Sequence, residues 1–250
     1  MKARRILLIA GWAHTAENLS PLCSLLSGKY DVQVTSTAKL LCASDPSLQT
    51  LPPASQYAKA LYGLIGKTTN EAPVIVAWSM GALVAIEAIA RLGLAASQLI
   101  IINGTAKFCA DKDYTYGVPE QNIRAMIASL ARKPEELLTT FFRDAMFPET
   151  GRSQEIERKT RAALSIPLET LKDGLSYLLR TDLRQILPEI SVPTLIIHGR
   201  QDKIIPFAAG EFLKKNIPGS QMVIHDNTGH SLILDQPAMI VEDIHTYMEK

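Results

Sequence analysis

The sequence predicts an α/β protein built on a doubly wound, mainly parallel sheet of about six strands. Short runs rich in isoleucine, valine and leucine recur along the chain, and most of them lack alternating polar residues. Such runs are typical of strands that are buried on both faces of a parallel sheet. Helical patterns separate the runs, and this order predicts right-handed crossovers. The expected strands are 6–10, 32–35, 74–78, 99–102, 194–197 and 222–224.

One long segment interrupts this alternation. About ninety residues between Asn103 and Pro193 show helical patterning without a convincing strand, which is too long for a loop in a compact domain. We expect a helical lid inserted at 107–188 into a core formed by 1–106 and 189–250, because the segment leaves from the carboxyl end of a strand, where open α/β sheets bind ligands. A helical appendage without a role at the site is the alternative. The expected helices are 16–27, 55–66, 80–92, 208–216 and 237–249 in the core, and 120–132, 134–142, 153–164 and 169–180 in the insertion.

Composition and charge exclude several classes of protein. With 47% hydrophobic and 20% charged residues, the chain reads as an ordinary globular protein, and 26 basic against 25 acidic residues give no global field for nucleic acid or a membrane surface. The three cysteines form no CxxC pair, which argues against a disulfide framework and a zinc site. No apolar run reaches the ~18 residues of a membrane span. We expect a cytoplasmic monomer that uses no metal or cofactor.

Ser79 carries the strongest local signal for chemistry. It directly follows the apolar run 74–78 and precedes a helical stretch, which is the context of a nucleophile elbow. The tight turn forces the flanking residues together, so the positions two before and two after the serine must be small. Ala77 and Gly81 meet this requirement. The pattern also occurs by chance, but its place at a strand-to-helix junction favours a serine nucleophile.

A serine hydroxyl needs a histidine base that a carboxylate orients. His230 follows the last predicted strand, and Asp202 lies in the loop after the penultimate one, so the chain order is serine, aspartate, histidine. A simple turn aspartate is the alternative role for Asp202, and Asp226 on the histidine's own loop is the near rival. The position after the preceding strand holds Asn103, which cannot be ionised. The histidines not expected to be the base are His14, His198, His225 and His245.

Acyl transfer also needs hydrogen-bond donors for the developing oxyanion. The expected donors are the backbone N–H groups of Met80, after the nucleophile, and Trp12, in the loop after the first strand. We expect Trp12 and Trp78 to line an apolar pocket, although core packing is an equal alternative for Trp78. Phenylalanines of the insertion extend this pocket into a predicted tunnel for an acyl chain. These phenylalanines are Phe108, Phe141, Phe142 and Phe147.

Over nearly its whole length the chain resembles the pimeloyl-[acyl-carrier-protein] methyl ester esterases of biotin synthesis, which have the α/β-hydrolase fold. The residues that carry the resemblance are Gly11-Trp12, Trp78-Ser79-Met80-Gly81, the segment 181–187 and His230. The resemblance implies hydrolysis of the methyl ester of a pimeloyl chain on acyl carrier protein, with release of methanol. It also implies Ser79, Asp202 and His230 as nucleophile, acid and base. The implied substrate contacts are Trp12, Met80 and a lid phenylalanine, Phe141.

The same resemblance implies docking of an acidic carrier protein on basic residues of the lid. The matching residues are Arg152, Arg158, Lys159 and Arg161. Glu155 and Glu157 dilute this charge, so a solvated helix face is the alternative.

Other functions stay open at this stage. Ala10, Ala77 and Ala82 replace the histidine and glycines usual in the family, which leaves a general short-chain carboxylesterase or a thioesterase possible. A lyase of menaquinone synthesis on the same triad would need arginines in the pocket, whereas the basic residues here lie in the lid. A dehalogenase or epoxide hydrolase would need aspartate in place of Ser79. A binding protein without activity is disfavoured, because three separated residues fit their catalytic roles in the right order.

Overall fold

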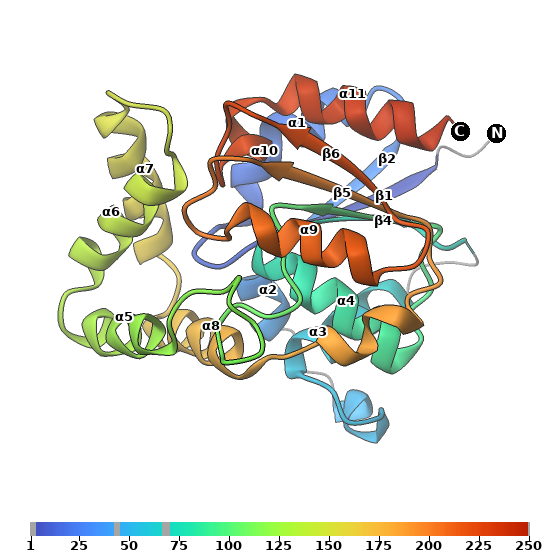
Figure 1. The fold of residues 1–250 in the computed structure, drawn as a ribbon, viewed down its shortest axis with the longest axis horizontal. Coiled ribbons are helices and arrows are strands. Elements are labelled where there is room, and N and C mark those ends of the chain that lie inside the picture. Colours follow the sequence, from blue (N-terminus) through green and yellow to red (C-terminus); the bar gives the residue numbers. More distant parts are fainter. Residues whose placement is uncertain (1–3, 43–45, 67–70, 250) are drawn as a thin grey trace.

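A single parallel sheet forms the centre of the molecule (Figure 1). The computed structural model describes residues 4–42, 46–66 and 71–249. Across the sheet the strand order is β2-β1-β3-β4-β5-β6, and every neighbouring pair is parallel. The predicted fold is confirmed, and each predicted strand is found within two residues of its expected ends. The strands are β1 (Arg5–Ala10), β2 (Asp31–Ser36), β3 (Val74–Trp78), β4 (Gln98–Ile102), β5 (Thr194–Gly199) and β6 (Gln221–His225).

Helices connect the strands and cover the sheet. The predicted stretch 16–27 is divided into a 3-10 turn, η1 (Ala16–Leu19), and a helix, α1 (Ser20–Leu26), which carries a proline in its first turn. Four further short elements were not predicted, because four to six residues are too few to show helical periodicity. They are α2 (Thr37–Cys42), η2 (Pro46–Thr50), η3 (Arg184–Glu189) and α10 (Leu232–Asp235). The longer core helices are α3 (Gln56–Gly66), α4 (Met80–Leu92), α9 (Phe207–Asn216) and α11 (Pro237–Met248).

The two faces of the sheet bury separate hydrophobic clusters. Leu7 and Ile9 of β1 belong to the larger cluster with α3, α4 and α9, whereas Ile6 and Leu8 point to the other face, toward α1 and α11. Because successive strand residues face opposite sides, both sets must be apolar in a strand that is covered twice. This burial explains why the sequence of the central strands shows no polar alternation. The edge strands β2 and β6 are only partly buried.

The segment between β4 and β5 forms the four expected helices. They are α5 (Glu120–Arg132), α6 (Pro134–Ala145), α7 (Ser153–Leu164) and α8 (Leu168–Arg180). Helix α6 packs on α7, and α5 packs on α8, so the insertion consists of two helix pairs beside the sheet (Figure 1). Helix α8 also contacts α2 of the core. None of the helices within the described ranges is long and apolar enough to cross a membrane.

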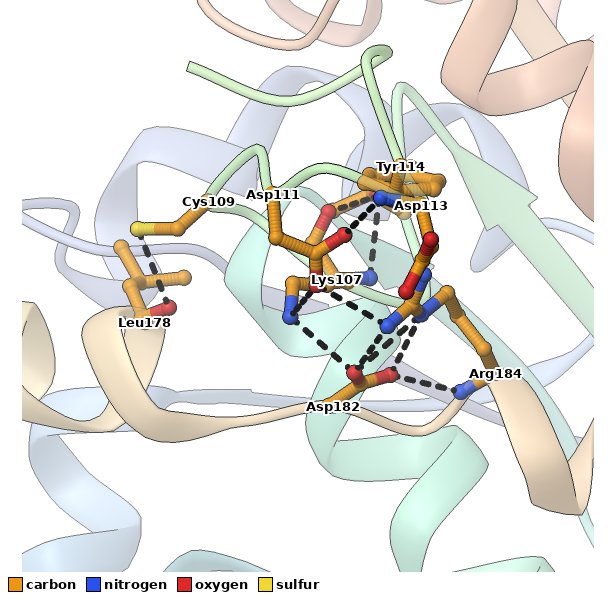
Figure 2. A network of polar contacts seen from close by, with 9 residues as sticks. Lys107, Cys109, Asp111, Asp113, Tyr114, Leu178, Asp182 and Arg184 are labelled. Atoms are coloured by element: carbon orange, nitrogen blue, oxygen red, sulfur yellow. Dashed lines mark hydrogen bonds and ion pairs between the residues drawn. The ribbon is translucent and has the colours of Figure 1, made fainter. Parts of the chain in front are cut away.

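A polar cluster joins the two ends of the insertion (Figure 2). Lys107 pairs with Asp182 in an antiparallel bridge, and its ammonium lies 3.0 Å from the Asp182 carboxylate and 2.7 Å from that of Asp111. Arg184 donates to both oxygens of Asp182 and to Asp111. Burial raises the pKa of Asp182, but hydrogen bonds from Arg184 and Lys107 outweigh this effect and lower the pKa to about 2. The cluster therefore holds the two chain ends of the insertion together.

This cluster predicts a specific loss of stability in acid. The pKa of Asp182 lies below its usual value of 3.8, so the ionised carboxylate stabilises the fold above pH ~4 and loses this effect as the pH falls toward ~2. The melting temperature of the wild-type protein should therefore fall more steeply over this interval than that of Asp182→Asn. Thermal unfolding followed by circular dichroism from pH ~6 to ~2 measures the difference. Asp113→Asn changes a carboxylate of the same loop and is the matched control, and equal slopes in all three proteins would contradict the prediction.

Candidate active site

Ser79 lies on a sharp turn between β3 and α4. Its backbone has φ +58° and ψ −125°, a strained conformation for a residue with a side chain. The neighbours leave little room: a Cβ at Gly81 would come 2.8 Å from the Ile9 carbonyl oxygen, and one at Gly11 would come 2.7 Å from the Ser79 Cβ. Gly81 is therefore needed by the turn itself, and Gly11 allows the loop after β1 to lie directly against Ser79.

Ser79, His230 and Asp202 form a continuous series of hydrogen bonds. His230 Nε2 lies 2.9 Å from the Ser79 hydroxyl oxygen, and His230 Nδ1 lies 2.8 Å from Asp202 Oδ2. The imidazole can thus accept a proton from the hydroxyl while its Nδ1–H donates a hydrogen bond to the ionised carboxylate. Asp226, the rival for the acid, instead pairs with Arg200 on the surface at 2.5 Å. Of the two aspartates, only Asp202 contacts His230.

The carboxylate of Asp202 is buried and is surrounded by donors. Its Oδ1 accepts hydrogen bonds from the backbone N–H groups of Ile204 at 2.8 Å and Ile205 at 2.9 Å. Burial alone would raise the pKa of Asp202, but the neighbouring His230 and the hydrogen bonds lower the pKa below its usual value. Asp202 is therefore ionised at neutral pH, as the orienting role requires.

Asn103, which from the sequence was expected only to leave its position without an acid, is part of this site. Its side-chain amide donates to Asp202 Oδ2 at 2.7 Å and to the Gly229 carbonyl oxygen at 3.3 Å. Asn103 is fully buried at the end of β4, with a φ of +46°. It thus links the loop of the carboxylate with the loop of the histidine. The only sign of this role in the sequence was the position of Asn103 directly after β4. An asparagine at that position does not by itself reveal which groups its amide contacts.

A cavity of about 180 Å³ opens beside Ser79. The sheet loops contribute Trp12 and Ile204, and the insertion contributes most of the apolar wall, including Phe141 and Leu175. An apolar pocket beside the serine was predicted, and its walls suit an aliphatic chain. The remaining apolar lining residues are Phe108, Val118, Ile123, Met126 and Leu178, and the other polar ones are Asn122, Asp144 and Lys203.

The two tryptophans have different surroundings. Trp12 lines the cavity, stacks edge-on with Phe141 at 4.9 Å and donates its indole N–H to the Leu171 carbonyl oxygen of α8. Trp78 has no exposed surface, lies on the opposite face of the sheet and donates to the His230 carbonyl oxygen at 3.0 Å. The expected substrate contact of Trp78 is therefore wrong, because strand alternation turns its side chain away from the cavity.

Two other expected substrate contacts lie behind the cavity surface. Met80 and Phe142 are each 1% exposed and do not line the cavity. Phe142 packs against Phe141 and the buried ring of His14. These side chains support the wall, while the Met80 backbone, in the first turn of α4, remains next to Ser79.

Of the remaining histidines, His198 lies beside Asp202. Its Nε2 lies 3.7 Å from Asp202 Oδ2 and 3.0 Å from the Ile205 carbonyl oxygen, and burial lowers its pKa. His198 therefore braces the loop that carries Asp202. His14 is also buried, which lowers its pKa well below the usual value. Neither ring occupies the position of the base.

The four residues expected to dock a carrier protein are not all exposed. Lys159 is only 2% exposed and its ammonium lies 3.5 Å from Glu155, so its expected docking contact is wrong. Burial lowers the pKa of Lys159, although the nearby carboxylates of Glu155 and Asp235 oppose this shift. Arg152 is held by Asp235 at 2.6 Å. Arg158 and Arg161 are 67% and 78% exposed and form surface ion pairs with Glu155 at 3.8 Å and with Glu157 at 2.6 Å.

The comparisons with known proteins fit this geometry. The pimeloyl-[acyl-carrier protein] methyl ester esterase of Nitrosomonas europaea is 28% identical over 170 residues, which span 67% of this chain and 68% of that protein. The protein of the same name from Xanthomonas campestris pv. campestris (strain B100) is 27% identical over 246 residues, or 97% and 94% of the two chains. The resemblance inferred from the sequence is confirmed. An esterase structure from Exiguobacterium antarcticum shares the fold, with a TM-score of 0.85 at 20% identity over 100% of this chain and 93% of that one.

A parallel sheet, a strained serine turn and a histidine hydrogen-bonded to both serine and aspartate are the features that define α/β hydrolases. The sequence model of the alpha/beta hydrolase family matches residues 6–243. The chain therefore belongs to the α/β hydrolase family. Within the described part of the chain, no group of three or more histidine, cysteine, aspartate or glutamate side chains is placed to hold a metal ion.

The contacts of Asn103 predict that this amide controls the reactivity of Ser79. Asn103→Leu keeps a similar volume but removes the donor to the Asp202 carboxylate, so the imidazole should lose its fixed orientation. We expect Ser79 to react with a fluorophosphonate at least about tenfold more slowly, the usual scale for a lost hydrogen bond to a charged group. Mass spectrometry of the labelled protein measures the rate. Asn216→Leu on α9 is the control, and an unchanged rate in folded Asn103→Leu would contradict the prediction.

Proposed function

We propose that this protein is a serine carboxylesterase in which Ser79 is the nucleophile, His230 the base and Asp202 the acid that orients it. The observation that carries the proposal is the series of hydrogen bonds from Ser79 through His230 to Asp202 beside an apolar cavity. The names of the curated relatives support an ester as the substrate. A serine hydroxyl is a weak nucleophile at neutral pH, and this arrangement is the usual means of activating it.

In the proposed reaction, Ser79 attacks the ester carbonyl while His230 takes the hydroxyl proton. The negative oxygen of the tetrahedral intermediate would accept hydrogen bonds from the backbone N–H groups of Met80 and Trp12. The Met80 N–H lies in the first turn of α4, where helix geometry provides no intrahelical acceptor. His230 then gives the proton to the departing alcohol, and a water molecule, activated by the same imidazole, hydrolyses the acyl-enzyme.

We further propose that the substrate is the methyl ester of a pimeloyl chain carried by acyl carrier protein, as in biotin synthesis. The relatives named for this reaction include one that aligns over 97% of the chain. The apolar walls of the cavity, which include Phe141, Leu175 and Ile123, suit the methylene groups of such a chain. Among the expected docking residues, Arg158 and Arg161 are the exposed pair that can meet an acidic carrier.

The central test is Ser79→Ala. Loss of the nucleophile should lower the turnover of methyl pimeloyl carrier protein and of p-nitrophenyl butyrate by about 10³-fold or more. The fold should persist, because the hydroxyl is not needed to fill the core. Methanol release and nitrophenol absorbance measure the two reactions, and circular dichroism checks the fold. Retention of more than a few per cent of either activity would contradict the assignment of Ser79.

A second experiment tests the carrier. Arg158→Glu with Arg161→Glu should lower kcat/KM for the carrier-linked ester several-fold at low salt, because these charges would attract the acidic carrier. The loss should shrink as salt screens the charges, with a Debye length of ~10 Å at 0.1 M. Lys214→Glu with Lys215→Glu makes the same charge change on α9 and is the control. An equal loss on p-nitrophenyl butyrate would instead indicate damage to the lid.

A further inference from the structure

The cavity beside Ser79 has polar residues that the proposed reaction does not use. Its deepest walls are buried and apolar, whereas Lys203 and Asn122 are exposed at its rim and Asp144 is half-buried. A substrate that extends from Ser79 along the apolar wall therefore reaches polar side chains at its other end. The charges of these side chains determine which chemical group the cavity favours at the end of the substrate remote from the ester.

Lys203 and Asp144 enter the rim from different parts of the fold. Lys203 directly follows Asp202 in the loop after β5, and its ammonium lies 3.5 Å from the centre of the Phe147 ring. Asp144 belongs to the last turn of α6 in the insertion. Neither side chain forms an ion pair with another residue in the described ranges. The contact with an aromatic face fixes the position of the Lys203 ammonium without removing its hydrogen-bond donors.

The two charges together favour one class of remote group. A carboxylate would be attracted by Lys203 but repelled by Asp144, and an alkyl end would form a hydrogen bond with neither side chain. An amide has a carbonyl oxygen that accepts from an ammonium and an N–H that donates to a carboxylate. An amide is the simplest neutral group that can form a hydrogen bond with each of the two side chains. The cavity would therefore bind an amide more tightly than a carboxylate or an alkyl end.

We propose that Lys203 and Asp144 are specificity-determining residues that bind an amide at the end of the substrate remote from the ester. Lys203 donates to the amide carbonyl oxygen, and Asp144 accepts from the amide N–H. The proposal rests on the proposed esterase function and adds the chemistry of the substrate's other end. A simple fatty ester has no such group at that end.

Three methyl esters with similar acyl chains test the proposal. They are methyl heptanoate, monomethyl pimelate and methyl 7-amino-7-oxoheptanoate, which end in an alkyl group, a carboxylate and an amide. The wild-type protein should hydrolyse the amide with the highest kcat/KM, about tenfold above the alkyl ester, the scale of a hydrogen bond to a charged group. Lys203→Met should reduce the ratio of the amide to the alkyl ester toward one. Asp144→Asn should raise kcat/KM for the carboxylate relative to the amide, because the repulsion disappears while Lys203 remains.

The opposite responses of the two variants separate specificity from damage to the fold. A merely structural role would lower all three rates in parallel and leave their ratios unchanged, which would overturn the proposal. Lys215→Met on α9 is the matched control and should keep the wild-type ratios. Equal hydrolysis of the three esters by the wild-type protein would also overturn the proposal while leaving the esterase function intact. Hydrolysis of none of the three esters, nor of p-nitrophenyl butyrate, would contradict the esterase function itself.

Discussion

The buried carboxylate of Asp202 is the constraint around which the site is arranged. A charge without exposed side-chain surface must be met by donors, because an unpaired buried charge is strongly destabilising. Here the donors come from three places: His230 after β6, Asn103 after β4 and the backbone that follows Asp202 itself. Strands β4, β5 and β6 are neighbours in a parallel sheet, so the segments that follow them lie together at the carboxyl-terminal end of the strands. The same contacts that satisfy the charge therefore orient the imidazole toward Ser79.

The insertion is fixed to this end of the sheet at several points, which gives the cavity its walls. Lys107 and Asp182 close its base, and Tyr177 of α8 donates to the buried Glu87 of α4 at 2.9 Å. Near the site, the Ser231 N–H donates to the Ala145 carbonyl oxygen at 3.0 Å. The Trp12 indole adds a hydrogen bond to α8. Because these bonds tie the helices to the loops that carry the site, the apolar wall is a consequence of the fold and not of one flexible segment.

Sequence patterns were reliable where one local rule decides the outcome. The six strands could be predicted because strands covered on both faces must be apolar throughout, and the elbow because its turn requires small residues such as Ala77 and Gly81. The contact of His230 with both Ser79 and Asp202 could be expected because Asp202 and His230 follow successive strands. Short elements such as α2 and α10 were missed, because they span less than two helical turns and are formed by packing more than by pattern.

The sequence by itself determined the parallel α/β architecture, the helical insertion and the serine, aspartate and histidine that meet at the sheet edge. Only the tertiary structure decided which side chains around them face the cavity, the core or solvent. Trp78 and Lys159 turn inward, while Asn103 becomes a partner of Asp202 and Lys203 reaches the rim. The reason is physical: a residue's type and spacing follow from its own helix or strand, but its neighbours come from segments that are distant along the chain.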